Sequence, residues 1–182
     1  MIYVFLAQGF EEIEALAVVD VLRRAELDVV TVGVGEDFII GSHNIPVAAD
    51  IREKNIVLDE KVEAIVLPGG MPGTLNLEKS AVVQKAIDWA IQNDKLICAI
   101  CAAPSILGHK GLLDGKIATC FPGFEEELFG AEVSKDFVVK DGNFITAKGM
   151  GSAIEFGLQI AEELTNPPEV KKIRASLQIY NG

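Results

Sequence analysis

The sequence predicts an α/β fold in which a mostly parallel sheet is covered by helices on both faces. Strand-like apolar runs alternate along the chain with segments whose apolar residues recur at helical spacing. The strand-like runs at 2–7, 64–67 and 96–100 are almost wholly apolar, as in buried parallel strands. With 182 residues, 49% hydrophobic and 24% charged, the chain is expected to form one domain over 1–182 around a sizeable core.

The expected elements follow one another without an internal repeat, a low-complexity tract or a linker. Glycine and proline clusters mark the loops, above all the loop over 68–73, and Pro167-Pro168 interrupts the chain before a last helix. In chain order we predict a strand over 2–7, a helix over 11–25, a strand over 28–34, a hairpin over 38–48, a strand over 64–67, a helix over 82–91, a strand over 96–100, a helix to about 109, a strand over 116–119, hairpin-like pieces over 132–140 and 143–147, a helix over 150–164 and the final helix.

Charge and composition exclude several function classes. A formal net charge of −11 and a pI near 4.6 repel phosphate backbones and anionic lipid, so neither nucleic acid nor a membrane is an expected partner. The first residues lack the basic leader and the long apolar run of a signal peptide, which predicts a cytoplasmic protein. Three cysteines, an odd number, then indicate reduced thiols rather than a disulfide framework.

The strongest functional signal is Cys101, where the apolar strand over 96–100 turns directly into the small residues Ala102 and Ala103. A nucleophile elbow places its reactive side chain at such a turn, at the carboxyl end of a strand and the start of a helix. The free N–H groups and the dipole of the helix favour a thiolate there. We therefore predict that Cys101 is a reactive thiol.

Two further elements are expected to meet Cys101 at the carboxyl edge of the sheet. Of the glutamates at the start of the first helix, Glu14 lies on the apolar helix row and is expected to be buried and protonated, so that it donates a hydrogen bond to the thiolate. The loop at Gly69 and Gly70 can present backbone N–H groups beside the sulfur, together with that of Ala102. These three amides form a predicted oxyanion hole.

The other candidates have simpler interpretations. Cys98 is expected in the core, on the opposite side of the sheet from Cys101. Cys120 is by default also a core residue, and the alternative is a place near the site. His109 lies eight residues beyond Cys101, roughly 12 Å along a helix, and cannot reach the thiol. We predict that His43 lies in a surface turn; the alternative is that it approaches the site of a neighbouring subunit. No ligand spacing for a metal and no nucleotide-binding motif indicates a cofactor.

The chain resembles the ThiJ/PfpI superfamily over nearly its whole length, in the YajL-like branch that includes the human parkinsonism-linked protein deglycase. The matching segments are the opening strand with 9–14, then 19–25, 67–70, 97–104 and 149–152 before the helix at 155–156. The resemblance implies a flavodoxin-like three-layer sandwich, a homodimer, Cys101 as the oxidisable nucleophile, Glu14 as its protonated partner, and the amides of Gly70 and Ala102 around the sulfur.

The chain also departs from this family at several positions. Ala102 stands where peptidase-like members place a histidine, and Phe121 takes the place of a histidine that approaches the cysteine in the human-like members. His43 replaces an arginine, and Met150, next to Gly149, replaces a proline. We expect His43, Phe121 and Gly149 to be pocket residues.

The resemblance implies functions of different classes. The first is a cofactor-independent enzyme of the glyoxalase III or protein-deglycase type, in which Cys101 adds to a reactive carbonyl or glycated substrate and Glu14 moves the proton, in carbonyl or oxidative stress. The second is a non-catalytic redox sensor or stress chaperone in which Cys101 is oxidised to the sulfinate. An intracellular cysteine peptidase or amidase is a weaker alternative, because it needs a histidine.

Overall fold

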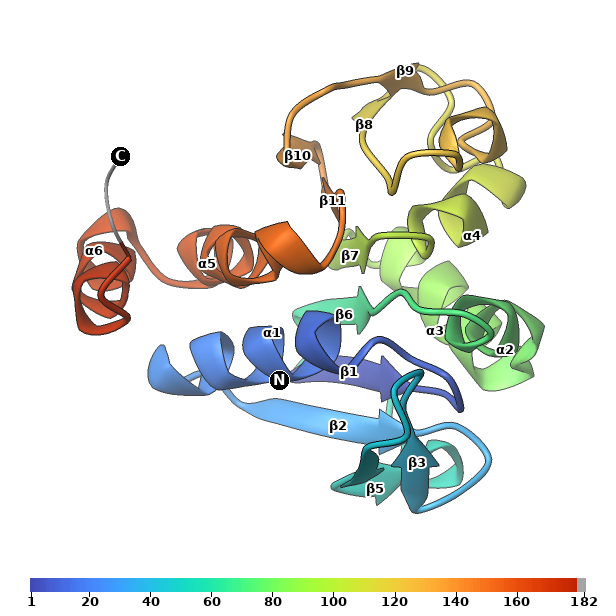
Figure 1. The fold of residues 1–182 in the computed structure, drawn as a ribbon, viewed down its shortest axis with the longest axis horizontal. Helices are drawn as coiled ribbons and strands as arrows, with labels where there is room; N and C mark the ends of the chain where they lie inside the picture. Colours follow the sequence, from blue (N-terminus) through green and yellow to red (C-terminus); the bar gives the residue numbers. More distant parts are fainter. Residues whose placement is uncertain (180–182) are drawn as a thin grey trace.

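The computed structural model describes residues 1–179, which form a seven-stranded sheet with helices on both faces (Figure 1). The strand order is β10-β11-β7-β6-β1-β2-β5. The elements are β1 Ile2–Leu6, α1 Glu12–Arg24, β2 Val29–Gly33, β3 Phe38–Ile40, β4 Pro46–Ala48, β5 Ile51–Arg52, the 3₁₀ turn η1 Glu53–Asn55, β6 Ala64–Leu67, α2 Gly73–Lys79, α3 Ala81–Gln92, β7 Leu96–Ile100, α4 Pro104–His109, β8 Ile117–Ala118, η2 Glu125–Glu127, β9 Glu132–Val133, β10 Val138–Asp141, β11 Phe144–Ala147, η3 Met150–Ser152, α5 Ala153–Leu164 and α6 Pro167–Ser176.

The sheet is parallel except for its edge strand β10, which pairs antiparallel with β11. At its centre, β1 pairs with β2 and β6, and β7 pairs with β6 and β11, all in parallel. The hairpin β3–β4 forms a separate two-stranded sheet. This topology confirms the predicted flavodoxin-like α/β class with a mostly parallel sheet.

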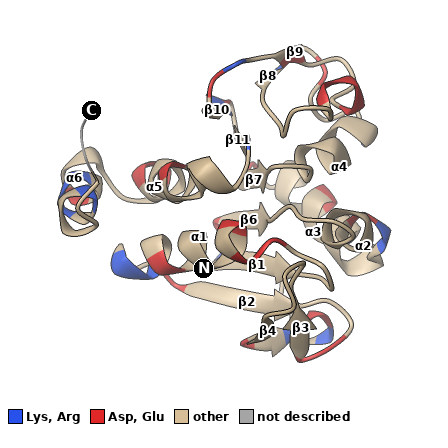
Figure 2. Ribbon diagram, in the orientation of Figure 1, with Lys and Arg blue, Asp and Glu red and all other residues tan. Residues whose placement is uncertain are grey.

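Two apolar clusters, one on each face of the sheet, make up the core. The first contains buried residues of α1, α5 and α6, among them Leu22 and Phe156. The second contains buried residues of α2, α3 and α4, among them Leu77 and Ile87. The central strands β1, β6 and β7 carry no charge and lie between the charged helices and loops (Figure 2). Helices on both faces thus bury the central strands except for part of Leu96, as their sequence predicts.

Several local predictions need correction. The segment over 132–140 is not one hairpin arm, since its first part, β9, pairs in parallel with β8, and β10 pairs with β11. The sequence missed α2, which begins inside a glycine- and proline-rich stretch, and the two-residue strand β5. The final helix starts at Pro167 rather than after Pro168, because a proline needs no N–H partner in the first turn of a helix.

Among residues 1–179, no helix is both long and apolar enough to cross a membrane. The strands β1, β6 and β7 end at the same edge of the sheet, on the right of Figure 1. The loops that follow β1 and β6 are joined there by a backbone hydrogen bond of 2.9 Å from Glu11 N–H to the Gly69 carbonyl. This edge holds the residues that the sequence singles out.

Candidate active site

Cys101 follows β7 directly and adopts a left-handed backbone conformation, with φ +66°. Such a φ is unfavourable for a residue with a Cβ, and it occurs in the strained turn of a nucleophile elbow. Two hydrogen bonds hold the turn: Cys101 N–H donates to the Ala147 carbonyl at 2.9 Å, and Phe121 N–H donates to the Cys101 carbonyl at 2.8 Å. The thiol is partly exposed, whereas Cys98 and Cys120 are buried.

Glu14 lies in the first turn of α1 with only 1% of its surface exposed. Its carboxyl group hydrogen-bonds the Cys101 thiol and accepts the Gly69 N–H at 3.0 Å and the Met150 N–H. Glu14 is brought to this position because Glu11 caps the helix, accepting the Glu14 N–H at 2.7 Å. The sequence singled out Glu14 from its helix row, but it gave no indication of the role of Glu11 as the cap.

The pKa values of the pair are both raised. Burial raises the pKa of Glu14 to about 7, and the negative charge of Glu11 adds to the effect against the hydrogen bonds from Cys101 and the backbone. Burial, and then the Glu14 carboxyl, raise the pKa of Cys101 to about 12. The sequence predicted that the elbow favours the thiolate, but burial outweighs the helix. At neutral pH the thiol is therefore the resting form, and the thiolate is a minor species that forms by transfer of the thiol proton to ionised Glu14.

The amides around the sulfur differ in part from the prediction. The backbone N–H groups of Gly70 and Ala102 hydrogen-bond the Cys101 sulfur and favour its ionised form. The Gly69 N–H instead donates to Glu14, so Gly69 orients the carboxyl group and is not an amide of the predicted oxyanion hole. A Cβ on Gly69 would lie 2.5 Å from Cys101 Cβ and 2.6 Å from Glu14 Oε2. The absence of a side chain at Gly69 thus lets the pair meet.

The expectation that Cys98 faces away from Cys101 is wrong. Both residues pack against the same apolar cluster on the α1 and α5 face of the sheet. The alternation of a strand ends at Cys101, where the positive φ redirects the side chain. Cys98 is fully buried and burial raises its pKa strongly, and Cys120 is 3% exposed with burial raising its pKa to about 11. Both behave as core residues.

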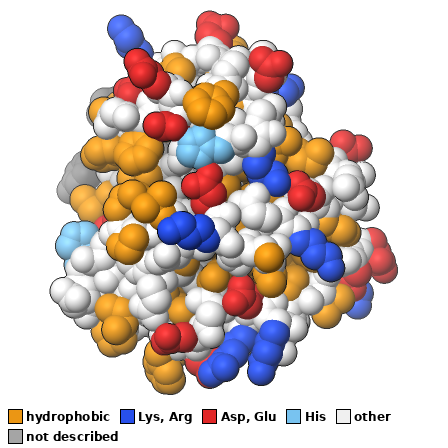
Figure 3. Space-filling model, turned by 90° about the vertical axis from the view of Figure 1, so that its right-hand side faces the viewer, with side chains coloured by type: hydrophobic (Ala, Val, Ile, Leu, Met, Phe, Trp, Pro, Cys, Tyr) orange, Lys and Arg blue, Asp and Glu red, His pale blue; other side chains and the backbone are white. Residues whose placement is uncertain are grey.

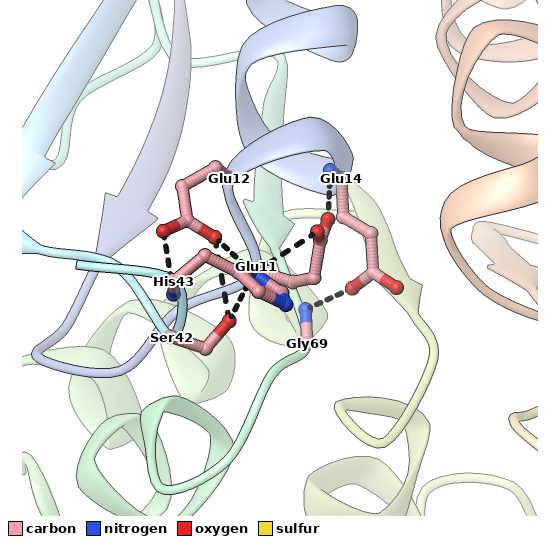
Figure 4. Close-up of polar contacts among 6 residues, drawn as sticks. All are labelled: Glu11, Glu12, Glu14, Ser42, His43 and Gly69. Carbon is pink, nitrogen blue, oxygen red and sulfur yellow. Dashed lines mark hydrogen bonds and ion pairs between the residues drawn. The ribbon is translucent and has the colours of Figure 1, made fainter. Parts of the chain in front are cut away.

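Neither histidine contacts the Cys101 thiol. His43 Nδ1 pairs with Glu12 Oε2 at 2.9 Å and is 3.9 Å from Glu11 Oε1 (Figure 4). His109 bridges Glu78 and Glu127, with nitrogen–oxygen distances of 2.5 and 2.8 Å. Pale-blue histidine side chains lie well apart on the face shown in Figure 3. A cysteine–histidine dyad is therefore not formed within the described residues.

The three residues that the sequence predicts to line a pocket, His43, Phe121 and Gly149, line two neighbouring hollows. One, of about 320 Å³, is lined mainly by apolar groups that include Phe121, Gly149 and Met150. The other is lined by Glu11, Glu12, His43 and Met150, among others. Gly149 lies close to both Phe121 and Glu14, since a Cβ there would be 3.2 Å from the Phe121 ring and 3.6 Å from Glu14 Oε1. Met150 lines both hollows.

The chain is similar in sequence to known proteins over most of its length. Residues 1–163 match the model of the DJ-1/PfpI family. Protein dj-1beta of Drosophila melanogaster is 37% identical over 98% of this chain and 97% of its own length. The glutathione-independent glyoxalase DJR-1.2 of Caenorhabditis elegans is 30% identical over 90% of this chain and 87% of its own.

Solved structures show the same fold. The crystal structure of Drosophila melanogaster DJ-1beta superposes with a TM-score of 0.92 at 34% identity, covering 98% of this chain and 97% of that one. The structure described as Toxoplasma gondii DJ-1, oxidized, gives 0.92 at 35% identity, covering 97% of this chain and 96% of that one.

Proposed function

The chain belongs to the DJ-1/PfpI family, and on that premise we propose that it is a glutathione-independent glyoxalase that converts a 2-oxoaldehyde such as methylglyoxal to the 2-hydroxy acid. The observation that carries the proposal is the hydrogen bond between the Glu14 carboxyl and the Cys101 thiol, with two amides directed at the sulfur. One similar protein, DJR-1.2 of Caenorhabditis elegans, is named a glutathione-independent glyoxalase, which supports the choice of reaction.

The reaction begins with addition of the thiol to the aldehyde. Glu14 takes the Cys101 proton, the sulfur attacks the aldehyde carbon, and a carbon–sulfur bond forms as the carbonyl π bond breaks. The oxygen of the new hemithioacetal carries the negative charge, which N–H groups at the elbow stabilise until Glu14 returns the proton. Because one carboxyl group both removes and delivers this proton, the step needs no histidine.

The second half transfers hydrogen within the bound substrate. Glu14, again ionised, removes the proton from the former aldehyde carbon to give an enediolate. The hydroxyl proton passes from the oxygen of this carbon to the oxygen of the adjacent carbon, and Glu14 returns its proton to the adjacent carbon, which leaves a thioester of the hydroxy acid on Cys101. Water then attacks the thioester carbonyl, the hydroxy acid leaves, and the thiol is regenerated. The net change is the addition of one water to one oxoaldehyde, without external oxidant or reductant. Removal of a carbonyl adduct from a protein, as in a deglycase, would proceed from the same hemithioacetal.

The test is lactate formation from methylglyoxal without added glutathione, in the wild type and in Cys101→Ala and Glu14→Gln. We expect turnover in the wild type, background rates in Cys101→Ala, and a loss of about a hundredfold or more in Glu14→Gln. Cys120→Ala is a matched control, because this buried cysteine is not part of the pair and its removal should leave the rate near that of the wild type. Wild-type activity that survives in Cys101→Ala would contradict the proposal.

A redox sensor is a second candidate, favoured by the partial exposure of Cys101 and by the two amides at its sulfur. Peroxide would oxidise the thiolate to the sulfenate and a second equivalent would give the sulfinate, each releasing one water or alcohol. Protonated Glu14 and the amides would then bind the new oxygens. Intact mass after peroxide treatment should increase by two oxygen atoms in the wild type and not in Cys101→Ser. A wild type without lactate formation but with this mass change would favour the sensor.

A further inference from the structure

A separate hollow of about 480 Å³ lies between the segment that begins at η1 and helix α3. Its apolar lining includes Ile56, Leu58 and the indole of Trp89. None of its lining residues belongs to the Cys101–Glu14 site. Both its size and its mixture of apolar walls with a few charged groups are typical of a small-molecule site.

Hydrogen bonds fix the segments that form the walls of this hollow. The Tyr3 hydroxyl donates to the Val57 carbonyl at 3.1 Å and accepts the Val57 N–H at 3.2 Å, which fixes the strand-like wall between Ile56 and Leu58. At the start of α3, the Ser80 hydroxyl donates to Glu53 Oε2 at 3.0 Å and so ties the two walls together. The hollow is therefore preformed, and a ligand would not need to order it.

The charges that line it leave a surplus of positive charge. Both oxygens of Glu53 already accept hydrogen bonds, from Gly35 N–H at 2.9 Å and from Ser80. Within residues 1–179, neither Lys54 nor Lys85 has a carboxylate within ion-pair distance, although the chain has 27 acidic residues against 16 basic ones. The lining residues thus include two lysines and one acidic residue, Glu53.

Trp89 adds an aromatic surface and a free donor. It is half-buried against the cluster of α2, α3 and α4, and its indole N–H donates to no group in the part of the chain that the structure describes. An aromatic ring packs on an indole better than an aliphatic group of the same area, and an ammonium group binds a carboxylate by charge-assisted hydrogen bonds. The lining of this hollow therefore includes both an indole that suits an aromatic ring and lysines that suit a carboxylate.

We propose that this hollow binds a small aromatic carboxylate, with the ring against Trp89, Ile56 and Leu58 and the carboxylate between Lys54 and Lys85. The site is independent of the Cys101 chemistry, so it gives this protein a second ligand. The same geometry disfavours a neutral aromatic compound, which leaves the ammonium groups without a partner, and a small aliphatic acid, which leaves the apolar wall in water.

Trp89 is the only tryptophan of the chain, so its fluorescence reports directly on the hollow. We would titrate the full-length protein with benzoate, with benzyl alcohol, which has the ring alone, and with acetate, which has the charge alone. We expect saturable quenching by benzoate only, weakened by added salt. In Lys54→Met/Lys85→Met the benzoate affinity should fall about tenfold or more. Lys171→Met, on α6, is the matched control and should bind benzoate like the wild type.

Two results would overturn the proposal. One is the absence of a saturable change with benzoate, with calorimetry on the same samples also showing no heat of binding. The other is equal affinity for benzyl alcohol and benzoate, or an unchanged affinity in the double variant, since either would remove the role of the lysines. Because both lysines are at the surface of the hollow, the double variant should fold, which circular dichroism would verify.

Discussion

Glu12 and Glu14, two glutamates in the first turn of α1, are both buried, with 3% and 1% of their surfaces exposed. Their pKa values nevertheless differ widely. Burial works to raise the pKa of Glu12, but hydrogen bonds from the side chain and backbone of His43 and from other backbone groups lower it to about 2. Burial raises the pKa of Glu14 to about 7. Glu14 lies deeper in the protein, so burial dominates its pKa, whereas at Glu12 the hydrogen bonds outweigh burial.

The partners come from two different regions. Glu12 faces the hairpin β3–β4, where it accepts the His43 N–H at 2.8 Å and pairs with the imidazole (Figure 4). Glu14 faces the elbow, where its neighbours are a thiol and the negative charge of Glu11. The first carboxylate is an anchor for a loop, and the second is a proton acceptor at neutral pH. One helical turn therefore supports two functions.

The largest effect should come from closing the gap in which Glu14 meets the thiol. In Gly69→Ala the new methyl group would lie 2.5 Å from Cys101 Cβ and 2.6 Å from Glu14 Oε2, so the pair must separate or the loop must shift. We expect a loss of stability of about 2 kcal/mol or more and lactate formation reduced at least as much as in Glu14→Gln. Urea unfolding and the methylglyoxal assay measure the two effects.

Gly151→Ala is the control for this substitution, since a Cβ there meets no atom within 4 Å and the backbone is not left-handed. Its stability should stay within about 0.5 kcal/mol of the wild type. Equal stability and equal activity in Gly69→Ala and Gly151→Ala would show that the elbow tolerates a wider separation than the structure indicates.

A smaller effect is expected in the pH dependence of stability. Because the folded-state pKa of Glu14 is raised from 4.5 to about 7, the folded state binds more protons, and the free energy of unfolding should fall between these pH values, by up to about 3 kcal/mol. For Glu12 the folded pKa is lowered, so its contribution is present above pH 4.5 and is lost as the pH falls to about 2. Glu14→Gln should remove the first slope, and Glu12→Gln the second. Urea unfolding across this pH range would detect each; a Glu14→Gln protein with the wild-type slope between pH 4.5 and 7 would refute the assignment.

The smallest effect concerns the hairpin alone. The hydrogen bond to Glu12 raises the pKa of His43, and hydrogen bonds to Glu78 and Glu127 raise the pKa of His109. In Glu12→Gln, the nuclear magnetic resonance titration of His43 should move down towards its ordinary range, with only the weaker effect of Glu11 remaining, while that of His109 stays where it is. An unchanged His43 titration would show that Glu12 does not hold the hairpin.

Some strands and site residues could be predicted from the sequence, and others could not. The bounds of β6 and β7 were predicted correctly because each is a short apolar run with a clear change of residue type at both ends. Polar residues precede both strands, a glycine- and proline-rich loop follows β6, and small residues that begin a helix follow β7. Glu14 was found because its place on the helix row depends only on local spacing. The pairing of Glu12 with His43 was missed because it joins residues 31 positions apart through a turn whose path has no local signal. The face of Cys98 was wrong because one positive φ, at Cys101, changes the direction of a side chain without changing the pattern of residues.

The central claim is that Glu14 takes the proton of Cys101, and the most direct measurement is the rate of Cys101 alkylation by iodoacetamide as a function of pH. In the wild type the rate should rise with an inflection near pH 7, where the pair loses its first proton, and rise again toward pH 12. In Glu14→Gln the inflection near pH 7 should disappear, because no carboxyl group remains to accept the thiol proton and burial still disfavours the thiolate. Glu155→Gln, an exposed glutamate paired with Arg174, is the control and should keep the wild-type profile. The same inflection in Glu14→Gln and in the wild type would contradict the account.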